Sequence, residues 1–134
     1  MSEERILNEL QKLCVGGTSA ELLSDGSRGI VLYRNVPTSG VQYGLPTATD
    51  VVVPVPSGYP GTMIDLAGLP VGSPFLPRVK GGSNSQGVIS VDGKQWQLAS
   101  YHPHQNGGAG PWNFQRHGFH TYLDQLIAWL ARLD

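Results

Sequence analysis

Frequent glycine and proline residues constrain this chain more than any other feature of its sequence. The 134 residues include 18 Gly and 10 Pro, which implies many turns between the structured elements. A chain of this length is expected to form a single domain, residues 1–134, with a modest core. The apolar content of 40 % suits a soluble globular protein, and the charged content is only 14 %.

Helices are expected near the two ends of the chain. Residues 3–14 place five side chains at helical spacing, with Ser2 as a candidate N-cap and Gly16-Gly17 as the stop: Ile6, Leu7, Leu10, Leu13 and Cys14. The C-terminal run predicts an amphipathic helix of about four turns. Its apolar positions are Phe119, Tyr122, Leu123, Leu126, Ile127, Leu130 and Leu133.

Strands are expected between these helices. Residues 29–36 and 47–56 are rich in β-branched side chains and are bounded by Pro and Gly. Residues 87–101 predict a hairpin around Asp92-Gly93, whereas residues 66–87 have the composition of a surface loop. The order predicts an α+β fold, an antiparallel meander of about four strands flanked by an N-terminal and a C-terminal helix, with one sheet face covered.

Charge and cysteine content exclude several classes of protein. The net charge of −1 offers no basic stripe for nucleic acid. The single cysteine, Cys14, cannot form an intramolecular disulfide, and its position beside Leu13 predicts a buried, unreactive thiol. The first ten residues do not resemble a signal peptide, and no apolar stretch could span a membrane, so we expect a cytoplasmic protein without membrane contact.

Histidines cluster around residues 100–113, SYHPHQNGGAGPWN. His102 and His104 flank Pro103, and His117 and His120 follow at a spacing that could place them on one helix face. Four imidazoles could ligate zinc. However, the proline between the first pair loosens a shared geometry, and residues 100–120 contain no acidic side chain to orient the imidazoles. We therefore assign no metal or other cofactor, and keep a His-ligated metal protein as an alternative.

The same stretch permits nucleophilic chemistry. Ser100 and His102 alternate at a predicted strand end, so both can project to one side and the imidazole can act as a base toward the hydroxyl. Gly107 and Gly108 allow a close backbone approach to an oxyanion. A serine that hydrogen-bonds to backbone remains the structural alternative.

Several motifs together resemble the ubiquitin-conjugating (UBC) fold, and in particular the bacterial branch called prokaryotic UBC-like family E. The first is the GYP turn with a later aspartate, Gly58, Tyr59, Pro60 and Asp65. The second is the strand end with Trp96, Gln97, Ser100 and His102. The third consists of Trp112, Tyr122 and Leu123, which lead into the last helix. The similarity as a whole covers roughly residues 5–133.

The resemblance implies an acyl carrier and transferase. This chain departs from the family pattern in two ways: His104 replaces the asparagine after His-Pro, and no cysteine follows position 14, so the usual catalytic cysteine is missing. An oxyester on Ser100 is then expected, with His102 as the base or an orienting group. His104, Asn106, Gly107 and Gly108 are the candidates for positioning and for stabilising the oxyanion. Lower-ranked candidates are Ser90, which an alternative alignment places at the nucleophile position, Trp112 and His117.

The implied partners are an activating enzyme and a ubiquitin-like protein of a bacterial conjugation pathway. The first helix is where the activating enzyme commonly docks in the UBC fold, which suggests Glu4, Arg5, Asn8 and Lys12 as partner-binding residues. The main alternative is a non-catalytic UBC-like module that binds the ubiquitin-like protein or its activating enzyme without covalent chemistry.

Overall fold

The computed structural model describes residues 2–24, 26–79, 85–100 and 111–133. Within this part of the chain, helix α1 (Ser2–Val15) comes first and helix α2 (Phe119–Ala131) last. Between them lie six strands and a short 3-10 helix: β1 (Ala20–Ser24), β2 (Gly29–Pro37), η1 (Gly40–Tyr43), β3 (Ala48–Pro54), β4 (Leu66–Pro70), β5 (Ser85–Val91) and β6 (Lys94–Ser100). The predicted α+β class is therefore confirmed.

The strands form one antiparallel sheet in the order β1-β2-β3-β4-β6-β5. It has six strands rather than the predicted four or so. The two additional strands are β1, which the sequence patterns did not indicate, and β4, which lies inside the predicted surface loop 66–87. The prediction of an unstructured loop was wrong at β4, because Leu66–Pro70 pairs with β6 along its whole length.

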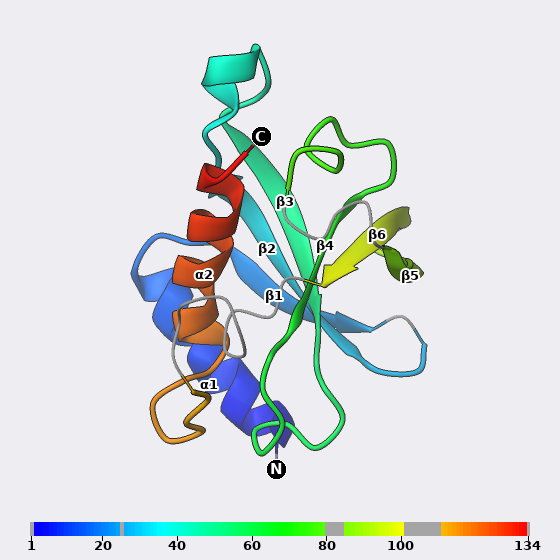
Figure 1. Ribbon diagram of the computed structural model, residues 1–134. Coiled ribbons are helices and arrows are strands. Elements are labelled where there is room, and N and C mark those ends of the chain that lie inside the picture. Colours follow the sequence, from blue (N-terminus) through cyan, green and yellow to red (C-terminus); the bar gives the residue numbers. More distant parts are fainter. Residues whose placement is uncertain (1, 25, 80–84, 101–110, 134) are drawn as a thin grey trace.

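Both helices pack on the same side of the sheet (Figure 1), over the larger of two apolar clusters. Strand β2 shows how the sheet serves both clusters. Val31 and Tyr33 face the helices, while Ile30 and Leu32 face the opposite side with Trp96 and Leu98. The sheet is thus buried on both faces in its middle, where the prediction had only one face covered, because its β5–β6 end curls over the far side of β2 and β3.

Two predicted turn features are present. Helix α1 ends at Val15, and Gly17, with a φ of 93°, terminates it. The Thr18 amide there donates to the Leu13 carbonyl and the Gly17 amide to the Cys14 carbonyl, the two hydrogen bonds of a Schellman motif. The β5–β6 hairpin turns at Asp92 and Gly93, whose φ angles of 56° and 73° match a type I′ turn.

The buried face of α1 differs from the prediction. Ile6, Leu10 and Leu13 are buried as expected, but Leu7 is 52 % exposed and the fourth buried position belongs to Glu9. Cys14 is exposed, so the expectation of a buried thiol was wrong. The stripe that meets the core is rotated toward Glu9, and this rotation carries Leu7 and Cys14 out of it.

Candidate functional site

The nucleophile and the base predicted from the sequence lie at and just after the end of strand β6. Ser100 is the last residue of β6 and its backbone pairs with Leu66. The Ser100 side chain and five of the candidate residues lie outside the described residues: His102, His104, Asn106, Gly107 and Gly108. Their proposed roles remain predictions, and the site has to be built from the residues that frame this segment.

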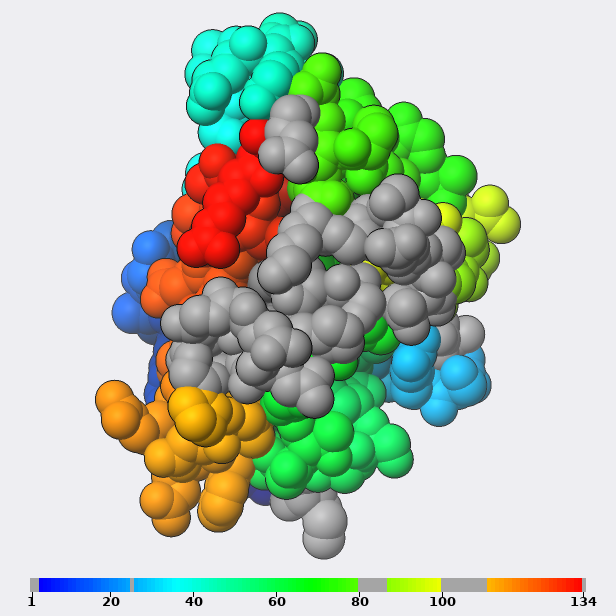
Figure 2. All heavy atoms as spheres, viewed as in Figure 1, coloured from blue at the N-terminus to red at the C-terminus, as the bar shows by residue number. Residues whose placement is uncertain are grey.

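Trp112 lies before α2 and contacts the GYP turn. Its indole Nε1 donates a hydrogen bond of 2.8 Å to the Pro60 carbonyl. Its ring lies 6.2 Å from the Tyr59 ring and 5.6 Å from the His117 ring, centroid to centroid. Two motifs of the sequence, the GYP turn and the tryptophan before the last helix, therefore meet in space. Figure 2 shows residues 111–118 at the surface next to this turn.

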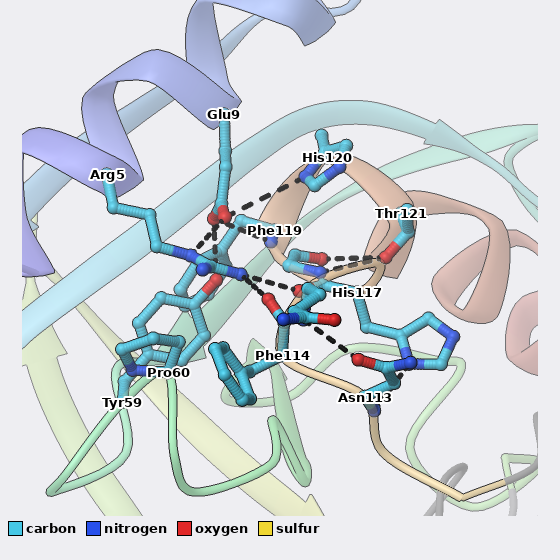
Figure 3. Close-up of polar contacts among 12 residues, drawn as sticks. Arg5, Glu9, Tyr59, Pro60, Asn113, Phe114, His117, Phe119, His120 and Thr121 are labelled. Carbon is cyan, nitrogen blue, oxygen red and sulfur yellow. Dashed lines mark hydrogen bonds and ion pairs between the residues drawn. The ribbon is translucent and has the colours of Figure 1, made fainter.

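Glu9 is the centre of the polar contacts beside this junction (Figure 3). Only 4 % of the residue is exposed. Its Oε1 accepts hydrogen bonds from the Tyr59 hydroxyl at 2.6 Å and the Phe119 amide at 3.1 Å, and Oε2 accepts one from Arg5 Nε at 2.8 Å. A buried carboxylate needs such donors to offset its lost hydration.

Arg5 extends this cluster to the segment before α2. Its guanidinium donates to the carbonyl oxygens of Phe114 and His117, the latter at 2.9 Å. The side chain is 30 % exposed and turned into the molecule, not freely displayed on the partner-facing surface where the prediction placed it. The other three predicted docking residues, Glu4, Asn8 and Lys12, are exposed.

The electrostatics of the cluster keep Tyr59 protonated. Burial raises the pKa of Tyr59 above its ordinary value, and the hydrogen bond to Glu9 and the Glu9 charge raise it further. The Arg5 charge lowers the pKa by less than these effects raise it. Tyr59 therefore acts as a hydrogen-bond donor that holds the GYP turn to α1, and not as an acid or base near neutral pH.

The two later histidines have different surroundings and do not form a pair. His117 lies before α2 and its Nδ1 accepts a hydrogen bond from the Asn113 amide at 3.0 Å. His120 lies in the first turn of α2, with a buried Nδ1 that has no hydrogen-bond partner and lies 3.9 Å from Glu9 Oε2. Among the described residues, no group of three or more His, Cys, Asp or Glu side chains could hold a metal ion.

Ser90, the lower-ranked nucleophile, is exposed on strand β5 and pairs with Gln95 beside the hairpin turn. It lines a shallow hollow with Ser24, Val91, Asp92, Gly93, Lys94 and Gln95. No histidine is among the residues that line this hollow, and Asp92 is the one carboxylate there.

The sequence patterns missed Glu9 as a member of the site, and they considered His120 only as a possible zinc ligand. One signal was present: Glu9 follows Ile6 by three residues and precedes Leu13 by four, so it occupies a position of the apolar stripe. A charged residue at such a position indicates either a solvated flank or a buried polar contact. Only the position of Tyr59, fifty residues away, distinguishes these two cases.

The antiparallel curled sheet, its two flanking helices and the GYP, Ser100 and Trp112 motifs define a UBC-like protein. Over residues 8–133 the chain matches the family described as Prokaryotic E2 family E, and it belongs to this family. Searches of curated proteins and of solved structures found no match. In the described part of the chain, neither helix is long and apolar enough to cross a membrane.

Proposed function

We propose that this protein carries and transfers the acyl group of a ubiquitin-like protein as an oxyester on Ser100. Membership of a prokaryotic E2 family supports a role in conjugation. The observation that carries the oxyester is the cysteine count: the chain has one cysteine, Cys14. It lies in the last turn of α1, where its thiol donates to the Ala20 carbonyl.

In the proposed step, the Ser100 hydroxyl oxygen attacks the thioester carbonyl that the activating enzyme presents. A C–O bond forms and the C–S bond breaks. The serine proton passes to His102 and then to the departing thiolate, so that the activating enzyme regains its thiol. An oxyester is a less activated acyl donor than a thioester, so positioning and oxyanion stabilisation by His104, Asn106, Gly107 and Gly108 have to supply more of the rate.

The test is to incubate the protein with ATP, a bacterial activating enzyme of the ubiquitin type and its ubiquitin-like protein. We expect a covalent adduct that resists thiol reductants and is cleaved by hydroxylamine or strong base. Ser100→Ala should reduce the adduct to background, while Cys14→Ser and Ser90→Ala should leave its yield within about twofold of the unmodified protein. His102→Ala should slow adduct formation by roughly 100-fold or more, the usual contribution of a general base.

Two outcomes would contradict this proposal. An adduct that dithiothreitol removes and that disappears in Cys14→Ser would assign a thioester to Cys14. An adduct that persists in Ser100→Ala but not in Ser90→Ala would move the acyl group to β5. Intact-protein mass spectrometry followed by peptide mapping distinguishes these outcomes.

A non-catalytic binding module is the second candidate function, and the outer face of α1 favours it. Asn8, Gln11, Lys12 and Val15 line a shallow hollow there, and Val15 is 83 % exposed. An apolar side chain within a polar rim is a common arrangement at protein interfaces. The test is size-exclusion chromatography of this protein with the ubiquitin-like protein or its activating enzyme. A complex that co-elutes, binds less tightly when Lys12→Glu is introduced and never becomes covalent would support this function over the transferase.

A further inference from the structure

We propose that Glu9 is a positioning residue for the transfer reaction proposed at Ser100, because its contacts fix the segment that contains Trp112. The inference rests on the proposed function for its kinetic consequence, but its structural part can be tested without it. Glu9 touches none of the candidate reacting groups that the structure describes. Its action would pass through Tyr59, Arg5 and the first turn of α2.

The Glu9 carboxylate joins three parts of the molecule that are distant in sequence. Arg5 belongs to α1, Tyr59 to the turn after β3, and the Phe119 amide to the start of α2, and each donates a hydrogen bond to it. Figure 3 shows these groups converging on the carboxylate from different elements. Removing one carboxylate therefore loosens three segments from a common point.

The carboxylate also takes the place of an N-cap side chain for α2. The N-cap residue is Gly118, which has no side chain to accept the first amides of the helix. The Phe119 amide is accepted by Glu9 from another helix instead, and a negative charge is favourable at a helix N-terminus. The Gly118 φ of −173° is open to any residue, but a Cβ at Gly118 would displace the Glu9 carboxylate from its present position.

Two series of hydrogen bonds connect Glu9 with Trp112 or with the segment that contains it. In the first, Tyr59 is held by Glu9, and the next residue, Pro60, accepts the Trp112 indole N–H. In the second, Arg5 is oriented by Glu9 and binds the Phe114 and His117 carbonyls of the segment that contains Trp112. Ser100 is held from the other side by the pairing of β6 with β4. The Ser100 backbone and the Trp112 side chain are thus held by separate contacts, and Glu9 determines those of Trp112.

The test compares Glu9→Gln with a control variant that destabilises α1 through the loss of apolar packing alone. Glu9→Gln keeps the size of the side chain and removes the charge that orders Arg5. Tyr59→Phe removes only the hydroxyl contact, and it serves as the second variant if Glu9→Gln does not fold. Leu10→Ala is the control, because Leu10 is buried next to Glu9 on α1 but contributes only apolar contacts among the described residues.

Two readouts separate positioning from mere stability. We expect the indole ¹⁵N–¹H resonance of Trp112 to shift in Glu9→Gln and Tyr59→Phe, and to stay in place in Leu10→Ala. We also expect the maximal rate of adduct formation to fall by about tenfold or more in Glu9→Gln. The concentration of activating enzyme that gives half of this rate should change by less than about twofold.

The proposal is overturned if the Trp112 resonance is unmoved in both Glu9→Gln and Tyr59→Phe. It is also overturned if the maximal rate falls no further in Glu9→Gln than in Leu10→Ala at a matched loss of Tm. If the unmodified protein forms no adduct at all, the proposed transferase function fails. The Trp112 resonance then decides the positioning role by itself, so that the two failures remain distinguishable.

Discussion

Glu9 and His120 show how single buried polar groups shape this part of the molecule. The Glu9 carboxylate accepts three hydrogen bonds, from Arg5, the Tyr59 hydroxyl and the Phe119 amide. The neighbouring His120 Nδ1 is buried without a hydrogen bond at 3.9 Å from the same carboxylate. A neutral imidazole tolerates this surrounding better than a charged one, because burial disfavours the charged form.

The stability of the protein should therefore depend on the protonation of His120. Burial lowers the pKa of His120 below its usual 6.5, and the charges of Lys12, Arg5 and His117 lower it too, while Glu9 opposes them. The unfolded state then binds its proton first as the pH falls. The contribution of neutral His120 to the unfolding free energy is therefore fully present above pH 6.5. It is lost as the pH drops from there toward the pKa that His120 has in the folded state.

Urea unfolding of the native protein and of His120→Gln between pH 8 and pH 5.5 measures this effect. We expect the unfolding free energy of the native protein to fall more steeply with decreasing pH than that of the variant. Differences between the two proteins cancel the contributions of the other histidines. A constant difference across this pH range would show that His120 titrates alike in the folded and unfolded states.

Strand β4 illustrates how packing at the scale of an element can outweigh local propensity. Its sequence, LAGLP, contains a central glycine and ends in proline, both poor strand formers. Gly68 lies directly opposite Val52 on β3 and Leu98 on β6. A Cβ at Gly68 would lie 2.7 Å from Val52 Cγ2 and 2.9 Å from Leu98 Cδ2. The glycine makes room for its two larger neighbours, so β4 can sit between them.

Gly68→Ala should for this reason destabilise the protein by about 1–3 kcal/mol, the usual cost of overpacking a core. Gly16→Ala is the matched control, because the nearest atom to its Cβ would be 3.5 Å away, an ordinary contact. Thermal or urea unfolding of both variants measures the difference. Equal stability of Gly68→Ala and the native protein would mean that β3 and β6 move apart freely at this point.

On the scale of the whole molecule, the two apolar clusters share strands β2 and β3. The helices cover Val31, Tyr33 and Val51 on one face, and the β5–β6 end of the sheet covers Leu32 and Val52 on the other. Tyr33 further ties the sheet to α2 through a 2.7 Å hydrogen bond to the Phe119 carbonyl. Neither cluster can open without disturbing strands that the other needs, so we expect one cooperative unit.

Trp96→Phe tests this cooperativity from the face opposite the helices. Trp96 is 1 % exposed and donates to the Val91 carbonyl at 3.0 Å, so the substitution should cost about 1–3 kcal/mol in packing and one hydrogen bond. Native-state hydrogen exchange should show the most protected amides of α2 losing protection by this same free energy. Unchanged protection in α2 would show that the two faces open independently.

The sequence by itself determined the features that depend on neighbouring residues. Residues 3–14 and 119–133 predicted the two helices because period 3.6 is a local pattern, and Asp92-Gly93 predicted its hairpin because few other residues adopt positive φ in succession. The order of the UBC-like motifs was sufficient to predict the family, which the match over residues 8–133 confirms.

Only the tertiary structure decided which way α1 faces and what holds the site. The local pattern of α1 fitted a stripe with Leu7 and Cys14 as well as one with Glu9. The choice fell to Glu9 because Tyr59, Arg5 and the Phe119 amide meet its carboxylate. Strand β4 was decided in the same way by its neighbours β3 and β6. These contacts join residues that are far apart in the chain, so their stabilising effect cannot be predicted from local periodicity or propensity.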